Sequence, residues 1–148
     1  IASILIFAFP FAAHAALTFG AATTDVVNYG SGTTIDAIST ALTYACWVYP
    51  TTLTSTRAII GFGNDAGNAS TRILLSGTSG DLRFTMNDTG TTNYISNSNS
   101  MSLNAWSFIA ATWDSTVGSS RAHIYRGTLT APLTETTYST ATDGSGSC

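Results

Sequence analysis

The amino-acid sequence predicts an all-β fold, a sandwich or barrel of short antiparallel strands, on three observations. First, the 148 residues include 26 Thr, 18 Ser and 13 Gly together with 7 Phe, 6 Tyr and 3 Trp, a composition that favours strands and turns. Second, Lys and Gln are absent and Glu occurs once, so the residues that build long surface helices are nearly missing. Third, turn-forming clusters recur at roughly 8–12 residues, the spacing of strands in a sandwich or barrel.

The length and charge of the chain exclude several classes of protein. The length suits one domain of ordinary size. An apolar fraction of 44% is enough to bury a core, which excludes a disordered tail. Charged residues make up only 9% of the chain and the formal net charge is −3, so there is no basic surface to neutralise phosphates. We therefore expect no nucleic-acid partner.

Residues 1–15 indicate the remnant of a secretory signal peptide. This stretch, IASILIFAFPFAAHA, is apolar and ends at 13–15 in a small-x-small cleavage pattern. It is too short for a transmembrane helix and Pro10 interrupts it, so we expect no membrane span in the mature chain. The alternative is a buried first strand or helix. On the first interpretation, residues 16–148 form one domain that is secreted, either extracellular or on a cell surface.

The clearest predicted strand is 41–49, after two shorter ones at 17–19 and 25–29. Its sequence ALTYACWVY has apolar residues on both faces, which predicts a strand buried within the sandwich, and Pro50 ends it. Cys46 lies in this strand, and we expect it to be a small buried hydrophobe. The only other cysteine is Cys148, so no disulfide framework is indicated, although a bridge between the two stays open.

A hairpin is predicted in the middle of the chain. Its arms are 72–75 and 81–86, joined by the turn sequence SGTSG. In the second arm Leu82, Phe84 and Met86 alternate with polar residues, which predicts one buried and one solvated face. Further strands are expected at 58–62, 93–96, 106–113 and 122–125, whereas the Thr/Ser-rich stretch after Thr130 is expected to be a long loop or a frayed end.

Two motifs in the strongest strands carry a family resemblance. They are ALTYACWVYP at 41–50, and WSFIAATWDS at 106–115 followed by AHIYRG at 122–127. Together they resemble the concanavalin A-like superfamily, and within it the laminin-G-like jelly-roll domain. The resemblance implies a two-sheet antiparallel jelly-roll sandwich. Because that family usually closes with two further strands, it also implies that the domain in 16–148 lacks its last strands and is incomplete at its C-terminus.

The sequence contains no catalytic constellation. Glycoside hydrolysis normally needs a pair of carboxylates. Glu135 is the only Glu, and none of the seven Asp lies two residues from another acid, as in the glucanases of the superfamily. The one histidine of the mature chain, His123, is expected to be a solvated strand residue, and no Cys/His metal spacing occurs. We therefore expect a protein that is not an enzyme.

Calcium is the inorganic ligand that the sequence best accommodates. The resemblance implies a possible single ion at the rim of the sandwich, and hard cations take carboxylate, amide and carbonyl oxygens from loops. The candidate ligands are Asn64, Asp65, Asn87 and Asp88. The favoured interpretation is that these Asn-Asp pairs are only good turn formers, because no ligand spacing as firm as that of the EF-hand loop is present.

Aromatic side chains are the candidates for ligand binding, because a sugar ring stacks on an exposed Trp or Tyr. We assign Tyr49, Tyr94 and Trp113 as ligand-binding candidates, and we expect Trp47 and Trp106 to pack in the core. The sequence thus predicts a secreted recognition module that binds a glycan or an extracellular protein. The alternatives are a ligand-free spacer domain of a larger surface or fibre protein and an accessory domain of a carbohydrate-active enzyme, since fold alone does not determine function.

Overall fold

The computed structural model describes residues 40–62, 71–76, 79–86, 92–97 and 100–144. The chain divides into two units, 1–30 and 31–148, and every described residue belongs to the second. The described residues form β-strands in two antiparallel sheets and contain no helix, which confirms the predicted all-β jelly-roll sandwich. The predicted signal peptide at 1–15 and the predicted strands at 17–19 and 25–29 lie outside the described residues.

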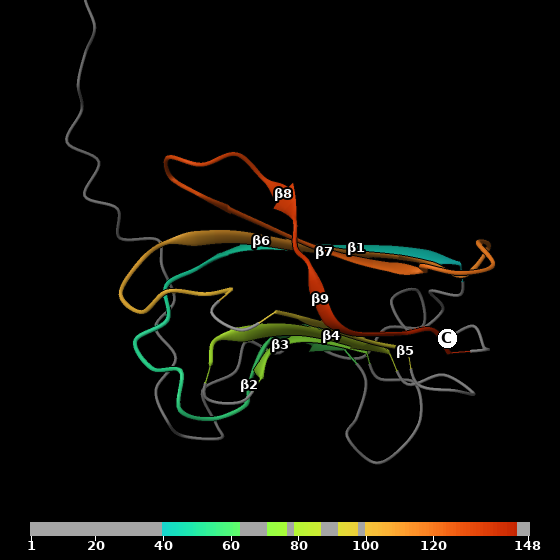
Figure 1. Cartoon of the computed structure of the whole chain (residues 1–148), viewed down its shortest axis with the longest axis horizontal. Helices are drawn as coiled ribbons and strands as arrows, with labels where there is room; N and C mark the ends of the chain where they lie inside the picture. The colour runs from blue at the N-terminus through green and yellow to red at the C-terminus, as the bar shows by residue number, and fades with distance from the viewer. Residues whose placement is uncertain (1–39, 63–70, 77–78, 87–91, 98–99, 145–148) are drawn as a thin grey trace, which may run out of the picture. The chain divides into compact units, whose positions relative to one another are not determined.

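The strands are divided between a four-stranded and a five-stranded sheet, which lie face to face (Figure 1). The four-stranded sheet has the order β1 (Ala41–Val48), β6 (Ser107–Asp114), β7 (Ala122–Thr128) and β8 (Thr134–Glu135). The five-stranded sheet has the order β2 (Arg57–Phe62), β3 (Thr71–Ser76), β4 (Asp81–Met86), β5 (Thr92–Ser96) and β9 (Tyr138–Thr142). All the strands predicted between 41 and 125 are present, with ends that differ by three residues at most.

The core lies between the two sheets and follows the two-residue alternation of the strands. Ile109 and Ile124 from the four-stranded sheet are fully buried. Leu82, Phe84 and Met86 of β4 are also fully buried, which confirms the buried face predicted for this arm of the hairpin. The solvated face predicted opposite them is wrong at Thr85, which is only 5% exposed. Burial of these side chains supplies the main stabilising free energy of such a fold, at about 1.5–3 kcal/mol for each large apolar residue.

β1 buries only one of its two faces. Leu42 is buried, and Cys46 packs against the core as predicted, although it is only partly buried. The opposite face is open, and Trp47 on it is 48% exposed. The prediction of a strand buried within the sandwich is therefore wrong: among the described strands β1 is the terminal strand of its sheet, and only its inner face packs against the core. Cys148 lies outside the described residues.

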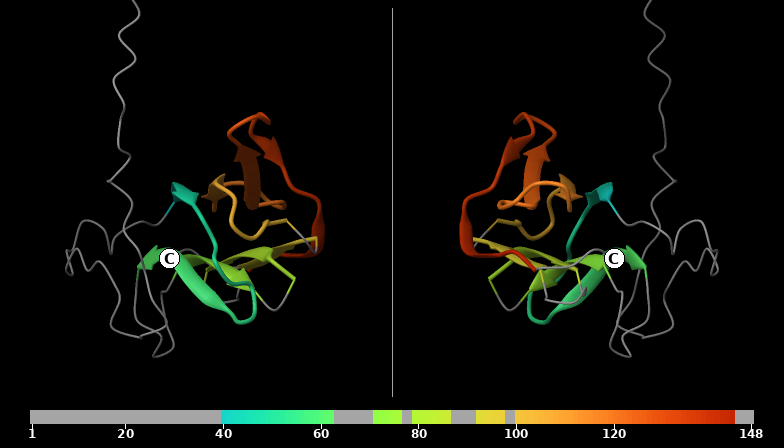
Figure 2. Two further views of the ribbon diagram at one scale, coloured as in Figure 1. Left: turned by 90° about the vertical axis from the view of Figure 1, so that its left-hand side faces the viewer. Right: turned by 90° about the vertical axis from the view of Figure 1, so that its right-hand side faces the viewer.

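The segment after Thr130 is ordered into strands, so the prediction of a loop or frayed end is wrong for residues 134–142. β8 pairs with β7, and β9 pairs with β5 of the other sheet. Figure 2 shows the chain crossing between the sheets at one edge of the sandwich. The crossing is held by two hydrogen bonds, in which Ile124 N donates to Tyr138 Oη at 2.9 Å and Thr136 N donates to Ile124 O at 2.8 Å.

The residue after β9 ties this strand to the rest of the sandwich. Asp143 accepts a hydrogen bond from Tyr94 Oη at 2.6 Å and others from the backbone N–H groups of Ser120 and Arg121 at 2.7 and 3.0 Å. Burial raises the pKa of Asp143, but these hydrogen bonds outweigh it and the net pKa is lowered. Burial, reinforced by the bond to Asp143, raises the pKa of Tyr94 to about 12. The carboxylate is therefore charged and the phenol neutral at physiological pH.

Candidate ligand-binding face

The outer face of the four-stranded sheet carries the candidate site, and we call it the binding face. Its side chains alternate with the core residues of β1, β6 and β7, and the strand register sorts them into cross-strand rows. The rows are Thr43–Thr112–His123, then Ala45–Ala110–Tyr125, then Trp47–Phe108–Gly127. Successive rows are two residues apart, or about 7 Å along the strands. Along β1 and β6 the side chains of this face thus change from polar to small to aromatic.

One end of the binding face presents four aromatic rings, and we call Trp47, Tyr49, Trp106 and Phe108 the aromatic end. The rings of Trp47 and Phe108 have centroids 5.4 Å apart and are tilted by 58°. The rings of Tyr49 and Trp106 have centroids 5.4 Å apart and are tilted by 55°. Trp47, Tyr49 and Trp106 are 48%, 44% and 37% exposed. Contacts within each pair fix the orientation of the rings while leaving aromatic surface open to solvent.

The connection between β7 and β8 passes close to the aromatic end. Gly127 pairs with Phe108, and a Cβ atom at position 127 would lie only 3.2 Å from the backbone of Leu133. The absence of a side chain at Gly127 therefore lets this connection approach the sheet. Leu133 and Leu129, both in the connection, are 45% and 73% exposed. Apolar surface thus extends beyond the four rings.

The aromatic end is free of formal charge. The segments that build it and its surroundings, 43–53, 102–112 and 127–134, contain no Asp, Glu, Lys or Arg. Their polar groups are hydroxyls, amides and backbone. An exposed apolar patch with a neutral polar surround is a typical binding surface, and its lack of charge favours a neutral ligand.

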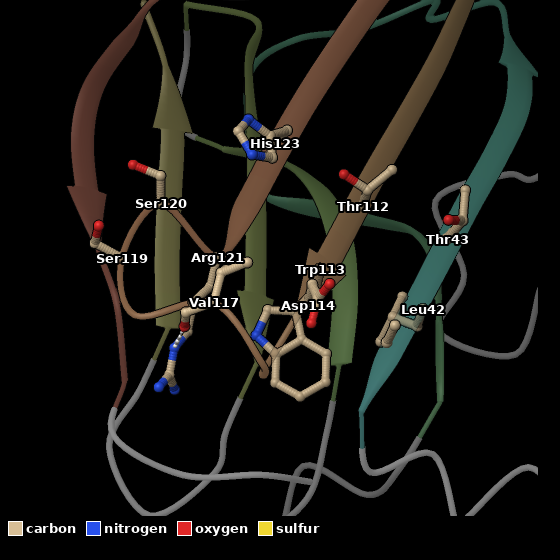
Figure 3. A pocket seen from close by; sticks show the side chains of 11 residues that line it. Leu42, Thr43, Thr112, Trp113, Asp114, Val117, Ser119, Ser120, Arg121 and His123 are labelled. Atoms are coloured by element: carbon tan, nitrogen blue, oxygen red, sulfur yellow. Dashed lines mark hydrogen bonds between the residues drawn. The ribbon is translucent and has the colours of Figure 1, made fainter.

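The other end of the binding face carries an open cleft of about 570 Å³. We call Thr43, Thr112, Asp114 and His123, which line it, the polar end. Figure 3 shows Thr43, Thr112 and His123 in one row across β1, β6 and β7, with Asp114 beyond the row toward the β6–β7 turn. That turn adds Val117, Ser119, Ser120 and Arg121 to the lining, and the strand residues Ala41, Leu42 and Trp113 complete it.

Hydrogen bonds orient the acid and the histidine of the polar end. Asp114 Oδ1 accepts hydrogen bonds from Thr116 Oγ1 at 2.6 Å and Thr116 N at 2.8 Å, which lower the pKa of Asp114. His123 Nδ1 lies 2.7 Å from Glu135 Oε1. These contacts leave Asp114 Oδ2 and His123 Nε2 as the atoms that a ligand could use.

Glu135, the only Glu in the chain, is held by a tyrosine as well as by His123. Tyr138 Oη donates to Glu135 Oε1 at 2.7 Å. This bond, followed by the contact with His123, lowers the pKa of Glu135. Burial, and then the bond to Glu135, raises the pKa of Tyr138. Glu135 therefore links β7 and β8 to the start of β9. The prediction of a solvated histidine at 123 is refined to a half-exposed histidine with a carboxylate partner.

The structure corrects most of the aromatic assignments made from sequence. Trp113 is 1% exposed and Tyr94 is 3% exposed, so both rings pack in the core. Trp113 also borders the cleft at the polar end, but with too little exposed surface for a sugar to stack on it. Trp47 and Trp106, expected in the core, are instead exposed beside Tyr49, which keeps its assignment as a ligand-binding candidate. Strand parity was the available signal, because Trp106 and Trp113 are seven residues apart and must lie on opposite faces of one strand.

The predicted calcium ligands Asn64, Asp65, Asn87 and Asp88 lie outside the described residues, so the calcium site stays a prediction. Within the described ranges, no three His, Cys, Asp or Glu residues come together in a way that could hold a metal ion. The same ranges contain no helix long and apolar enough to cross a membrane.

Comparison with known families confirms the resemblance seen in the two sequence motifs. A laminin-G family model, described as the concanavalin A-like lectin/glucanases superfamily, matches residues 20–146, and the chain belongs to this superfamily. No curated protein and no solved structure gives a significant match. The superfamily includes both lectins and glucanases, so membership supports a lectin-like or structural module without naming a ligand.

Proposed function

From membership of the concanavalin A-like superfamily, we propose that this protein is a non-enzymatic recognition module that binds an uncharged carbohydrate through the aromatic end of its binding face. The observation that carries the proposal is the exposure of Trp47, Tyr49 and Trp106, held in pairs on a surface without formal charge. We also propose that it acts outside the cell, as the signal-like sequence at 1–15 and the low charge suggest.

The physical basis is the match between a pyranose ring and an aromatic ring. The C–H groups on one face of a sugar form an apolar surface that stacks on an aromatic ring, while its hydroxyls remain at the edge. The hydroxyl and amide groups around the aromatic end suit that edge. Exposed aromatic rings of this size are costly to a protein that does not use them, since they promote non-specific association. A ligand-free spacer would leave them without a role.

A protein partner is the second candidate, and the observation that favours it is the exposure of Leu129 and Leu133 in the β7–β8 connection. Aliphatic side chains pack well in protein interfaces but do not stack with sugars. A ligand that needs both leucines and the rings would therefore be a protein. Substitution of the leucines separates the two candidates, because glycan binding should not depend on their aliphatic side chains.

The test is a screen of neutral glycans against the full chain and its Trp47→Ala and Tyr49→Ala variants. We expect each variant to lose about tenfold or more in affinity, since one lost stacking contact is worth about 1.4 kcal/mol or more. The matched control is Ile60→Ala, an exposed apolar residue of β2 in the other sheet, which should bind like the parent protein. Glycan binding that both aromatic variants retain in full would contradict the proposal.

The proposed absence of catalysis has its own measurement. Incubation with β-glucans should release no new reducing ends, because the chain offers no pair of acids spaced as in the glucanases. Glycan hydrolysis that a single Asp→Asn substitution abolishes would show that the module is an enzyme.

A further inference from the structure

The aromatic end and the cleft at the polar end, which we call the polar cleft, lie on the same binding face and are separated along the direction of the strands. Thr43 and Trp47 are on the same strand and the same face, four residues apart, which places their rows about 13 Å apart. A single six-membered sugar ring is about the size of one aromatic ring. One sugar can therefore occupy the aromatic end or the cleft, but it cannot occupy both.

Between the two ends lies the row Ala45–Ala110–Tyr125, whose side chains on β1 and β6 are small. Ala45 of β1 and Ala110 of β6 are paired, and each contributes only a methyl group to the binding face. Taller groups, Tyr125 of β7 and Glu135 of β8, flank the two alanines on one side. Ala45 is exposed, whereas Ala110 is only 7% exposed, so the shallow track from the rings to the cleft runs mainly over Ala45 of β1.

The cleft offers groups that suit sugar hydroxyls. Thr43 and Thr112 contribute hydroxyls, which both donate and accept hydrogen bonds. Asp114 has Oδ2 available as an acceptor, and His123 has Nε2 available once Nδ1 is engaged by Glu135. The hydroxyls and the imidazole in one row, with the Asp114 carboxylate beside it, supply the donors and acceptors that a polyhydroxylated ligand needs, and Leu42 and Val117 add apolar surface to the same cleft.

We propose that the ligand of the binding face is an extended, uncharged oligosaccharide chain that runs along β1 and β6, stacks on the aromatic end and places a further sugar unit in the polar cleft. This inference rests on the proposed function and adds the ligand's length and direction. A chain that spans both ends gains the second contact without a second loss of translational freedom, so affinity rises steeply with length until the span is filled.

The test measures binding by titration calorimetry of cello-, manno- and malto-oligosaccharides of one to six units to the full chain. We expect at least one series to bind, with affinity rising at least tenfold from one unit to the longest chains and then levelling off. Ala45→Phe should block the track and remove that gain, while binding of the shortest ligands stays within twofold. Thr112→Val and His123→Ala should also reduce the affinity of the long chains only, by about three- to tenfold each.

Matched controls lie on the other sheet. Ala58→Phe adds the same ring to an exposed position of β2, and Thr142→Val removes an exposed hydroxyl from β9, so both should leave the length dependence unchanged. Equal affinity for short and long chains, unaffected by Ala45→Phe, would overturn the extended ligand while leaving the proposed function intact. Failure of every series to bind at any length would overturn both.

Discussion

Trp106 immediately precedes β6 and Trp113 lies near its end, and the two side chains differ in how much they are exposed to solvent. Trp113 is fully enclosed between the sheets, whereas Trp106 is 37% exposed and pairs with Tyr49 on the binding face. The two residues are chemically identical, and only the parity of their positions along the strand separates them. In the four-stranded sheet, parity determines whether an aromatic residue of β1 or β6 stabilises the fold or is available to a ligand.

The largest expected difference between the two faces is in stability. Trp113→Ala should lower the free energy of unfolding by about 3–5 kcal/mol, because it opens a cavity in the core. Trp106→Ala should cost about half of that or less, since part of its surface is already in water. Urea denaturation followed by circular dichroism measures both. Equal losses would mean that the binding face is packed as tightly as the core.

The reactivity of a thiol on β1 gives a second comparison, between the inner and outer faces of this strand. Burial raises the pKa of Cys46, which points inward, while its neighbour Ala45 points outward. With Cys148 replaced by Ser, we expect Cys46 to react with a disulfide reagent at pH 8 at least about ten times more slowly than a cysteine placed by Ala45→Cys in a Cys46→Ala background. Both thiols should react equally fast in urea. Similar rates in the native protein would contradict the assignment of faces.

The smallest expected effect concerns the charged cluster on the binding face. The pKa of Glu135 is lowered in the folded protein, so its contribution to stability is present above the unfolded pKa and is lost as the pH falls through the folded pKa. Because Glu135 and His123 are 42% and 37% exposed, that contribution should be below about 1 kcal/mol. Denaturation at pH 7 and pH 3 should show a slightly smaller pH dependence for Glu135→Gln than for the parent. An identical pH dependence would show that the cluster adds nothing to stability.

Local sequence patterns were enough to predict most of the strands, but they did not predict which aromatic residues form the candidate site. Alternation in 81–86 and turn clusters beside it were enough to place β4, because Leu82, Phe84 and Met86 recur at every second residue and bury one face. The same reasoning missed β9, whose sequence YSTAT contributes only Tyr138 to the core and whose order comes from pairing with β5. Long-range pairing of this kind leaves no periodic pattern in the sequence.

The aromatic assignments failed for a different reason. Tyr94 and Trp113 were judged by residue type, which a sugar site and a core share. Their strands carry the information that separates the two roles, since Trp113 shares a face with Ile109 and Ala111, whereas Trp106 shares one with Phe108. What no sequence pattern could supply is the meeting of Glu135 with His123 and Tyr138, because it depends on where the chain crosses between the sheets.

The pairing of β9 with β5 also has a consequence for the order in which the protein folds. Tyr94 and Asp143, which are bonded to each other, are 49 residues apart in the chain, and the connection between them holds three strands of the other sheet. A contact of such separation forms late, both during synthesis and during refolding, because loop closure must come first. Until then, the backbone of β5 that β9 will cover is an unpaired edge that can bind another nascent chain. We therefore expect refolding yield to fall with protein concentration, and to fall further in Tyr94→Phe, whose last strand is fastened less firmly.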